Sequence, residues 1–365
     1  MIPQAAPPLR IARYRDAIDR AVARVLSGPT YILGAAVAEF EAAFAAQSGG
    51  GHCVGVASGT DALALALRAL GIGPGDEVLL PAMTFAGTAQ AILHCGASPV
   101  FVEVDAATRC LDPTAAAQAV TPRSAALVPV HLFGHPADMP ALMALADRHG
   151  LAVVEDCAQS HGALLDGRPL GSFGHAAAYS FYPTKNLGGV GDGGAVVTRD
   201  PAVAERVRRL RHYGFGEGQR VSGQIGFNSR LDELQAAILL ALLPHLAEGN
   251  AERRAIASRY GELLGGTGIG LPAGHEGCVY HQFAVTVRDR ETLRTRLDAA
   301  GIGTAVHYAP GLHRHPAFLE GARAPLPVTD SLADSLLSLP IQPEVACGRE
   351  ERIAAVIREC LPCAA

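Results

Sequence analysis

Lys185 is the residue whose type and setting point most directly to chemistry. It lies in the glycine-rich stretch SFYPTKNLGGVGDGG, directly after a short apolar run. A lysine in such a loop is often simply solvated. In a close-packed, partly desolvated site, however, the amine can form a Schiff base with a cofactor aldehyde, and nearby glycines let a flat ring approach the backbone. Lys185 is therefore a candidate covalent catalytic residue.

Asp156 lies 29 residues before Lys185, at the end of the apolar run LAVVED. Open α/β sheets place ligand-binding groups at the carboxyl ends of their strands, and a buried carboxylate there needs a partner. Asp156 could simply cap the following turn. The alternative is an ion pair with a pyridinium nitrogen, which keeps the ring protonated and makes it an electron sink. Gln159 and His161 follow on the same turn and could contact the ring substituents.

An anion-binding site is expected where the run VGVASGT passes into a helical pattern. Ser58, Gly59 and Thr60 lie at this point, and the N-terminus of a helix offers free amides and the positive end of its dipole. The same turn also suits an ordinary helix cap, with Thr60 or Asp61 as the capping residue. Phe85, which follows the run DEVLLPA, is either a core residue or a platform for ring stacking.

Together, the lysine, the upstream carboxylate and the anion-binding turn supply what pyridoxal phosphate (PLP) requires. One motif competes with this interpretation, because Gly189-x-Gly191-x-x-Gly194 matches the dinucleotide-binding fingerprint. That fingerprint must follow a strand and open a helix. Here it is followed by AVVTRD, which is predicted to be a strand, and we reject the dinucleotide interpretation.

These residues have to be positioned by alternating strands and helices. Short apolar runs alternate with helical patterns along the chain, which is typical of a sheet built from βαβ units. The runs of Val, Leu and Ala suit strands that are buried on both faces of a mostly parallel sheet. Strands are predicted at 52–58, 76–82, 98–104, 124–132, 151–157, 176–182 and 194–198, and helices at 61–71, 84–96 and 141–150.

The second part of the chain has a different pattern. A long helical region covers 230–264, and Pro244 is expected to kink or break it. Beyond Gly270 the predicted elements are strands at 279–287 and 304–309 and helices at 291–302 and 349–360. We therefore predict a large PLP-binding domain over 1–249 and a smaller α/β domain over 250–365, as the length of 365 residues allows.

Composition excludes several other classes of protein. Apolar residues make up 49% of the chain and charged residues 18%, which permits a large core. The net charge of -5 argues against a nucleic-acid-binding face, and no apolar run is long enough to span a membrane. Met1–Asp16 lacks the apolar segment of a secretory signal, and the pair Cys360 and Cys363 has no second pair to complete a zinc site. We expect a cytoplasmic protein with reduced thiols and no bound metal, and neither nucleic acid nor membrane as a partner.

The chain resembles the DegT/DnrJ-type nucleotide-sugar aminotransferases, which are PLP enzymes of fold type I. The resemblance covers nearly the whole length and rests on many segments together rather than on any one of them. These segments are GPTYILGAAVAEFEAAFA, ASGTDALALALRALGIGPGDEV, PAMTFAGTAQAI, VPVHLFGHPADM, VVEDCAQSHGA, SFYPTKNLGGVGDGGAVVT and GFNSRLDELQAA.

The resemblance implies a role for each candidate residue around the cofactor ring. Lys185 would form the Schiff base with the cofactor and shuttle protons. Asp156 would pair with the ring nitrogen, Gln159 would lie near the ring hydroxyl, and Phe85 would stack on the ring. Because some members of the family carry histidine in place of the lysine and act as dehydratases, Lys185 favours transamination.

The resemblance also implies how the phosphate and the substrate are held. Gly59, Thr60 and Ser180 would bind the phosphate of the cofactor. Asn228 would reach the cofactor phosphate of a neighbouring subunit, so the active sites of a homodimer would be shared; its alternative role is a helix N-cap. Further residues implied to contact the substrate are His161, Tyr213, Arg230, His307, Tyr308 and His313.

The stretch KNLG followed by GDGG resembles members acting on the 3-keto group of dTDP-6-deoxyhexoses, with L-glutamate as the expected amino donor. The segment HYAPGLHRHPAF departs from the related HYPxPxHxQPAY at Ala309, Gly311 and His315, which leaves the identity of the sugar open. Alternative activities are transamination of a 4-keto sugar or of a cyclitol such as an inosose. A non-catalytic regulator with the same fold is a further alternative, but it should lack Lys185 or Asp156.

Overall fold

A seven-stranded, mostly parallel sheet forms the centre of the protein. The computed structural model describes residues 1–49, 51–216, 218 and 220–361. The strands follow the order β1-β9-β8-β5-β4-β2-β3, and only β9 runs antiparallel to its neighbours. Their bounds are β1 His52–Val56, β2 Glu77–Pro81, β3 Ser98–Val102, β4 Ser124–Leu127, β5 Ala152–Asp156, β8 Ala176–Ser180 and β9 Gly194–Thr198. The predicted α/β class with a mostly parallel sheet is confirmed.

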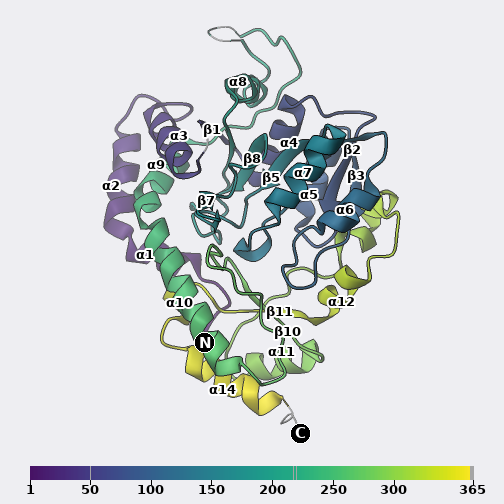
Figure 1. Ribbon diagram of the computed structural model, residues 1–365. Helices are drawn as coiled ribbons and strands as arrows, with labels where there is room; N and C mark the ends of the chain where they lie inside the picture. The colour runs from purple at the N-terminus through teal and green to yellow at the C-terminus, as the bar shows by residue number, and fades with distance from the viewer. Residues whose placement is uncertain (50, 217, 219, 362–365) are drawn as a thin grey trace.

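Helices cover both faces of this sheet (Figure 1). Side chains alternate along each strand, so that Val153 and Val154 of β5 belong to cores on opposite faces. One face packs against α4 (Gly59–Ala69), α5 (Ala86–His94) and α8 (Pro201–Leu210). The other face packs against α6 (Pro113–Ala119) and α7 (Met139–His149) at one end, and against α2 (Arg15–Leu26), α3 (Ala35–Gln47) and α9 (Glu233–Leu242) at the other.

The predicted break at Pro244 is confirmed. Helix α9 is followed by the 3-10 turn Leu243–His245 and then by α10 (Leu246–Leu264). Proline lacks the backbone N–H that a continuous α-helix needs at this position. The N-terminal helix α1 (Pro7–Arg13) contacts α10 through the ion pair between Arg13 and Glu248.

A second, smaller core forms around α10, α11 (Arg290–Ala299) and α14 (Glu350–Cys360). These helices pack on a two-stranded antiparallel sheet of β10 (Phe283–Thr286) and β11 (Leu336–Leu339). Ile2 joins this core from the N-terminus through a bridge to Ile302. Because α10 crosses residue 250 without interruption, the division into 1–249 and 250–365 stays a prediction.

Short elements complete the chain. They are the hairpin of β6 (Leu164–Leu165) and β7 (Arg168–Pro169), the helices α12 (Pro327–Ser335) and α13 (Pro343–Ala346), and the 3-10 turns Leu132–Gly134, Leu312–Arg314 and Pro316–Gly321. The seven cysteines described are free thiols, whereas Cys363 of the pair noted above lies outside the described residues.

Two predictions about the C-terminal strands are wrong. The segment 304–309 forms no strand and makes only the isolated bridge from Ala305 to Ser338. The strand expected at 279–287 is limited to β10, and its partner β11 was not anticipated. Part of each segment lines a cavity described below, through His281, Gln282, His307 and Tyr308.

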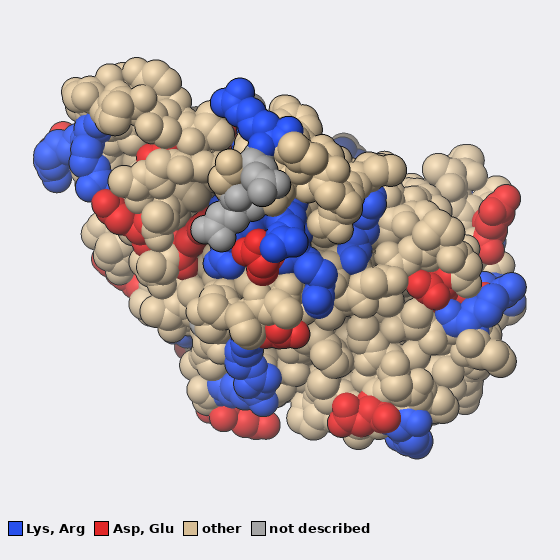
Figure 2. Space-filling model, turned by 90° about the horizontal axis from the view of Figure 1, so that it is seen from above, with Lys and Arg blue, Asp and Glu red and all other residues tan. Residues whose placement is uncertain are grey.

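The end of the molecule that carries α8 is seen directly in Figure 2. On that face, basic and acidic side chains form small, separate groups on a surface that is mostly of other residues. In α8, for example, Glu205 pairs with Arg209 at 2.8 Å. Among the described residues, no helix combines the length and the apolar character that a bilayer span requires.

Candidate active site

A cavity of about 520 Å³ lies at the carboxyl edge of the sheet. The segments that follow β1, β2, β5 and β8 all contribute to its lining, as is usual for ligand sites in open α/β sheets. The cavity brings together nine of the residues selected from the sequence, namely Gly59, Thr60, Phe85, Asp156, Gln159, Ser180, Lys185, His307 and Tyr308.

Lys185 is the only lysine in the sequence, which contains 29 arginines. It follows β8, and its backbone N–H donates to the carbonyl of Tyr182 at 2.9 Å. Burial lowers the pKa of Lys185 to about 8, while the Asp156 carboxylate acts in the opposite direction. More of the amine is therefore unprotonated at neutral pH than in a solvated lysine. The presence of a single lysine, located at this strand end, is a sequence signal that the motifs alone did not provide.

Asp156 ends β5 with its carboxylate buried beside the cavity. Its Oδ2 accepts a hydrogen bond from Thr88 Oγ1 at 2.9 Å, and its Oδ1 accepts one from the N–H of Ala158 at 3.1 Å. Burial raises the pKa of Asp156, and these hydrogen bonds and Lys185 oppose the shift. The residue thus caps the turn and also presents a carboxylate to the cavity. Since no cationic side chain of the described chain lies within 4.0 Å of it, a cation in the cavity would be stabilised there.

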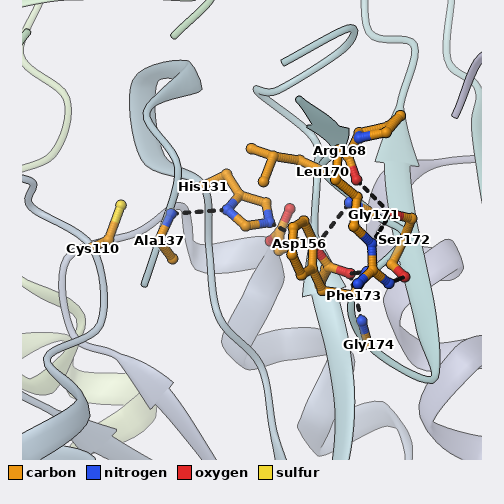
Figure 3. A network of polar contacts seen from close by, with 12 residues as sticks. Cys110, His131, Ala137, Asp156, Arg168, Leu170, Gly171, Ser172, Phe173 and Gly174 are labelled. Carbon is orange, nitrogen blue, oxygen red and sulfur yellow. Dashed lines mark hydrogen bonds and ion pairs between the residues drawn. The ribbon is translucent and has the colours of Figure 1, made fainter. Parts of the chain in front are cut away.

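The residue before Asp156 anchors this strand end on the opposite face of the sheet. Figure 3 shows the network, in which His131 and the loop around Gly171 surround the end of β5. His131 donates through Nε2 to Glu155 at 3.0 Å, because its Nδ1 already accepts the N–H of Ala137. Glu155 also accepts hydrogen bonds of 2.7–2.8 Å from the backbone amides of Gly171, Phe173 and Gly174.

The same network includes a group of donor atoms close enough for a metal ion. Donor atoms of His131, Glu155 and Cys157 lie within 4.8 Å of one another. Both ring nitrogens of His131 and both oxygens of Glu155 are already used in hydrogen bonds to the protein. A metal would have to replace these bonds, so the group is better described as a structural anchor for β5.

Gln159 and Tyr308 close another side of the cavity. The side-chain oxygen of Gln159 accepts the backbone N–H of Phe133 at 2.6 Å, and its amide donates to the Tyr308 hydroxyl at 3.0 Å. The Tyr308 ring lies 5.9 Å from the ring of Phe85, measured between centroids. Phe85 is 58% exposed, so it is an exposed ring of the cavity wall and not a core residue.

The N-terminus of α4 forms the end of the cavity predicted to bind an anion. Ser58 is the N-cap, since its Oγ accepts the N–H of Asp61 at 3.1 Å; the cap is therefore neither Thr60 nor Asp61. The amides of Gly59 and Thr60 begin the helix and have no intrahelical acceptors. A Cβ on Gly59 would lie 2.6 Å from the Cβ of Ser180, so glycine is required for α4 to start this close to the end of β8.

Several lining residues were not selected from the sequence. Thr88 holds Asp156, and His281 and Gln282 reach the cavity from the segment before β10. Burial and neighbouring cationic groups, among them Lys185, lower the pKa of His281 well below its usual value. The stretch VYHQF offered no local signal, because these residues approach Lys185 only through the packing of the smaller core.

Four residues expected to contact substrate lie outside this cavity, and two of them, His161 and His313, are buried elsewhere. His161 is fully buried among the rings of Phe44, Tyr179 and Phe181, with centroid distances of 5.5–6.4 Å, and burial lowers its pKa to about 3. His313 is buried and bonds Asp330 through Nε2 at 2.9 Å. Neither position places the side chain against a ligand in the cavity.

Asn228, Arg230 and Tyr213 gather at a neighbouring location. Arg230 donates through Nη2 to Asn228 Oδ1 at 2.5 Å, and its guanidinium lies 5.6 Å from the centre of the Tyr213 ring. Asn228 and Arg230 line a second, polar cavity of about 500 Å³, which shares Asp192 with the first. Asp232 is the residue at the N-cap of α9, so Asn228 does not have that role.

A lysine and a buried carboxylate at the carboxyl edge of a mainly parallel sheet, beside a free helix N-terminus, define the class: a PLP-dependent enzyme of fold type I. The chain belongs to the DegT/DnrJ/EryC1/StrS aminotransferase family, which matches residues 13–358. The resemblance inferred from the motifs is confirmed.

Several named relatives match almost the whole length of the chain. One is a UDP-N-acetyl-3-dehydro-alpha-D-glucosamine 3-aminotransferase of Acidithiobacillus ferrooxidans, 46% identical over 99% of this chain and 98% of that one. Another is a dTDP-3-amino-3,4,6-trideoxy-alpha-D-glucose transaminase of Streptomyces venezuelae, 50% identical over 94% and 92%. The crystal structure of S. venezuelae DesV in complex with a ketimine intermediate superposes with a TM-score of 0.95, at 48% identity and 98% coverage of both chains.

Proposed function

We propose that this aminotransferase uses PLP to move an amino group from L-glutamate to the keto group of a sugar carried on a nucleotide. The observation that carries the proposal is the meeting of Lys185, the only lysine, with the buried Asp156 in one cavity. We further propose a dTDP-3-keto-6-deoxyhexose as the acceptor, since the relative from S. venezuelae is named for a dTDP-linked 3-amino sugar.

The residues around the cavity fit PLP. The amides of Gly59 and Thr60 and the hydroxyl of Ser180 would hold the phosphate at the positive end of α4. The Asp156 carboxylate would pair with the protonated ring nitrogen, which explains why a buried acid lies there without an ion pair. Phe85 would stack on one face of the ring, and Gln159 would lie near the ring hydroxyl.

When bound, PLP supplies an electron sink for negative charge at the carbon bearing the exchanged amine. The chain provides the proton transfer and the orientation. With a pKa of about 8, Lys185 Nζ can both release and take up a proton near neutral pH, which is what a general acid–base group needs. Thr88 and the Ala158 amide hold the Asp156 oxygens in a fixed direction.

We also propose a homodimer with shared active sites. In one chain Asn228 and Arg230 line the second cavity, not the first. Tyr31, Ile32, Tyr182, Val190 and Tyr213 are large side chains that remain between 40% and 53% exposed. A second copy that covers these residues would bring Asn228 to the cofactor phosphate of its neighbour, with Arg230 and Tyr213 close to the substrate.

The test of the substrate is a panel of nucleotide-linked keto sugars assayed with L-glutamate by mass spectrometry. The panel contains dTDP-linked 3-keto and 4-keto hexoses and UDP-linked 3-keto sugars, together with an inosose. We expect the mass change of keto-to-amine exchange with the dTDP-linked 3-keto sugar. If only the UDP-linked 3-keto sugar gives a product, the acceptor belongs instead to the class for which the A. ferrooxidans relative is named.

A regulatory role is the second candidate, because one relative from Saccharopolyspora erythraea, 48% identical, is named an erythromycin biosynthesis sensory transduction protein. A non-catalytic sensor would not need Lys185 and Asp156, and both are present. Bleaching of the visible band of the PLP-loaded protein by L-glutamate would support the enzyme. Stable binding of a sugar nucleotide with no spectral change and no product would support the sensor.

A further inference from the structure

The guanidinium of Arg10 lies inside the loop that carries Lys185. Its Nη1 donates to the carbonyls of Lys185 at 2.6 Å and Asn186 at 3.2 Å. Its Nη2 donates to the carbonyls of Pro183 at 2.8 Å and Gly188 at 2.9 Å. One side chain from α1 therefore holds four carbonyls of the segment 183–188.

The loop is shaped to accept this side chain. A Cβ on Gly188 would lie 2.8 Å from Arg10 Nη2 and 2.5 Å from the carbonyl oxygen of Tyr182. Only a glycine lets the chain turn this tightly around the guanidinium. Leu187, which precedes Gly188, is buried in the core that also contains residues of α2, α3 and α9. The loop is therefore fixed by packing as well as by Arg10.

Arg10 is bound to the loop and not to an acid. It makes no ion pair with the described residues, and its neighbour Arg13 on the same helix makes ion pairs with Glu248, Glu252 and Glu344. A partly buried guanidinium that bonds only neutral carbonyls gives up water without gaining an ion pair, which favours a role in fixing the geometry of the loop. Its planar fork of donors suits several carbonyls at once, which a lysine ammonium cannot reproduce.

The next residue of the loop is held from the other side. Asn186 donates through Nδ2 to Asn250 Oδ1 at 2.9 Å and to the Val279 carbonyl at 3.0 Å. Its Oδ1 lies 3.2 Å from Nδ1 of His281, a residue of the cavity lining. Lys185 is thus carried on a loop fixed between α1 and the segment before β10, although its own side chain reaches the cavity.

We propose that Arg10 is a positioning residue for Lys185, which acts by fixing the backbone of 183–188 so that the amine is held toward Asp156 in the cavity. Arg10 does not line the cavity and needs no contact with cofactor or substrate. The inference rests on the proposed function, because Lys185 must be the residue that reacts.

The test compares Arg10→Met with Arg13→Met in the full-length, PLP-loaded protein. The control removes an arginine from the same helix that bonds acids instead of the loop. Two quantities are measured: the rate of bleaching by L-glutamate, and the pH midpoint of the visible band without substrate. We expect Arg10→Met to slow bleaching by about 10- to 100-fold, as misplacement of a reacting group does. The pH midpoint should rise in Arg10→Met. Water that enters a loosened loop would stabilise the protonated, charged form of the linkage between Lys185 and PLP.

Gly188→Ala supplies an independent variant, which disturbs the same contact from the loop side if Arg10→Met fails to fold. It should slow bleaching and raise the midpoint, whereas Arg13→Met should match the wild type. Folded Arg10→Met or Gly188→Ala protein with a wild-type rate and midpoint would overturn the proposal. Failure of the proposed function is separately visible in the wild type: reduction with borohydride would then leave no PLP mass on Lys185.

Discussion

At the scale of single residues, the proposed chemistry rests on one amine, that of Lys185, and one acid, that of Asp156. All 29 other residues in the Lys and Arg count are arginines, whose side chains stay protonated and cannot serve as nucleophiles near neutral pH. Burial lowers the pKa of Lys185 and raises that of Asp156, so each group is shifted toward its neutral form. The proposed cofactor, with a cationic ring and an aldehyde, would pair with the acid and react with the amine.

Lys185→Ala should abolish transamination, because no other amine of the chain can replace the covalent link or the proton transfer. The loss should exceed about a thousandfold, in line with the removal of an essential catalytic group. The single lysine makes the measurement direct: borohydride reduction with PLP should add one PLP mass to the peptide containing Lys185 in the wild type and none to the variant. Full turnover by the variant would contradict the assignment.

Asp156→Asn should leave the fold intact and lower the rate of the glutamate half-reaction by about 100-fold or more. The amide cannot stabilise a protonated ring nitrogen, and each pKa unit lost there is about 1.4 kcal/mol. Stopped-flow absorbance gives the rate, and thermal unfolding gives the stability. A near-normal rate would show that Asp156 only caps its turn through Ala158.

At the scale of elements, the sequence predicted the parts of the site that depend on local pattern. Lys185, Asp156 and Gly59 each follow or end an apolar run, and the carboxyl ends of parallel strands meet at one edge. The contributions of His281 and Arg10 could not be predicted in this way, because they arrive through packing between segments 96 and 175 residues from Lys185 in sequence. The failed strand at 304–309 has the same cause, since His307 and Tyr308 face a cavity instead of a neighbouring strand.

Glu233 of α9 fixes the start of α3, next to the second cavity. Its carboxylate accepts the backbone N–H groups of Gly34, Ala36 and Val37 at 2.8–2.9 Å, although 196 residues or more separate the partners. Glu233→Ala leaves three amides without an acceptor and should lower the free energy of unfolding by about 3 kcal/mol. Urea unfolding measures the change. The control Asp232→Ala, an exposed carboxylate without a capping bond, should have little effect; equal losses would contradict this role.

At the scale of the whole molecule, segments distant in sequence are joined by buried polar contacts. Glu77, at the start of β2, binds Arg323 through both oxygens at 2.8 and 2.9 Å and also accepts from Thr121 and Arg123. Arg323 lies two residues after the 3-10 turn Pro316–Gly321. These contacts hold the C-terminal segment around Arg323 against the start of β2 in the central sheet.

These bonds lower the pKa of Glu77 to about 2, with the Arg323 hydrogen bond as the main cause. The carboxyl is deprotonated more readily in the folded state, so its stabilising effect is present above pH about 4.3 and is lost as pH falls toward 2. Glu77→Gln should therefore be less stable than the wild type by about 2 kcal/mol at pH 6, with the difference shrinking below pH 4. Denaturant unfolding at a series of pH values measures it. A constant difference across this range would contradict the role of the carboxylate.

The largest scale is the assembly, where the position of Asn228 makes a sharp prediction. Asn228 lies outside the cavity of its own chain and beside Arg230, so we expect it to complete the phosphate site of a second copy. A Lys185→Ala chain combined with an Asn228→Ala chain would then place both lesions in one shared site and leave the other site intact. In an equal random mixture of the two chains, half of the dimers are mixed and half of their sites are intact, so activity should return to about a quarter of the wild-type value. Each variant alone must be impaired, and native mass spectrometry must confirm the mixed dimers. If activity does not return under those conditions, Asn228 serves its own chain, because in that case each lesion disables the site of the chain that carries it.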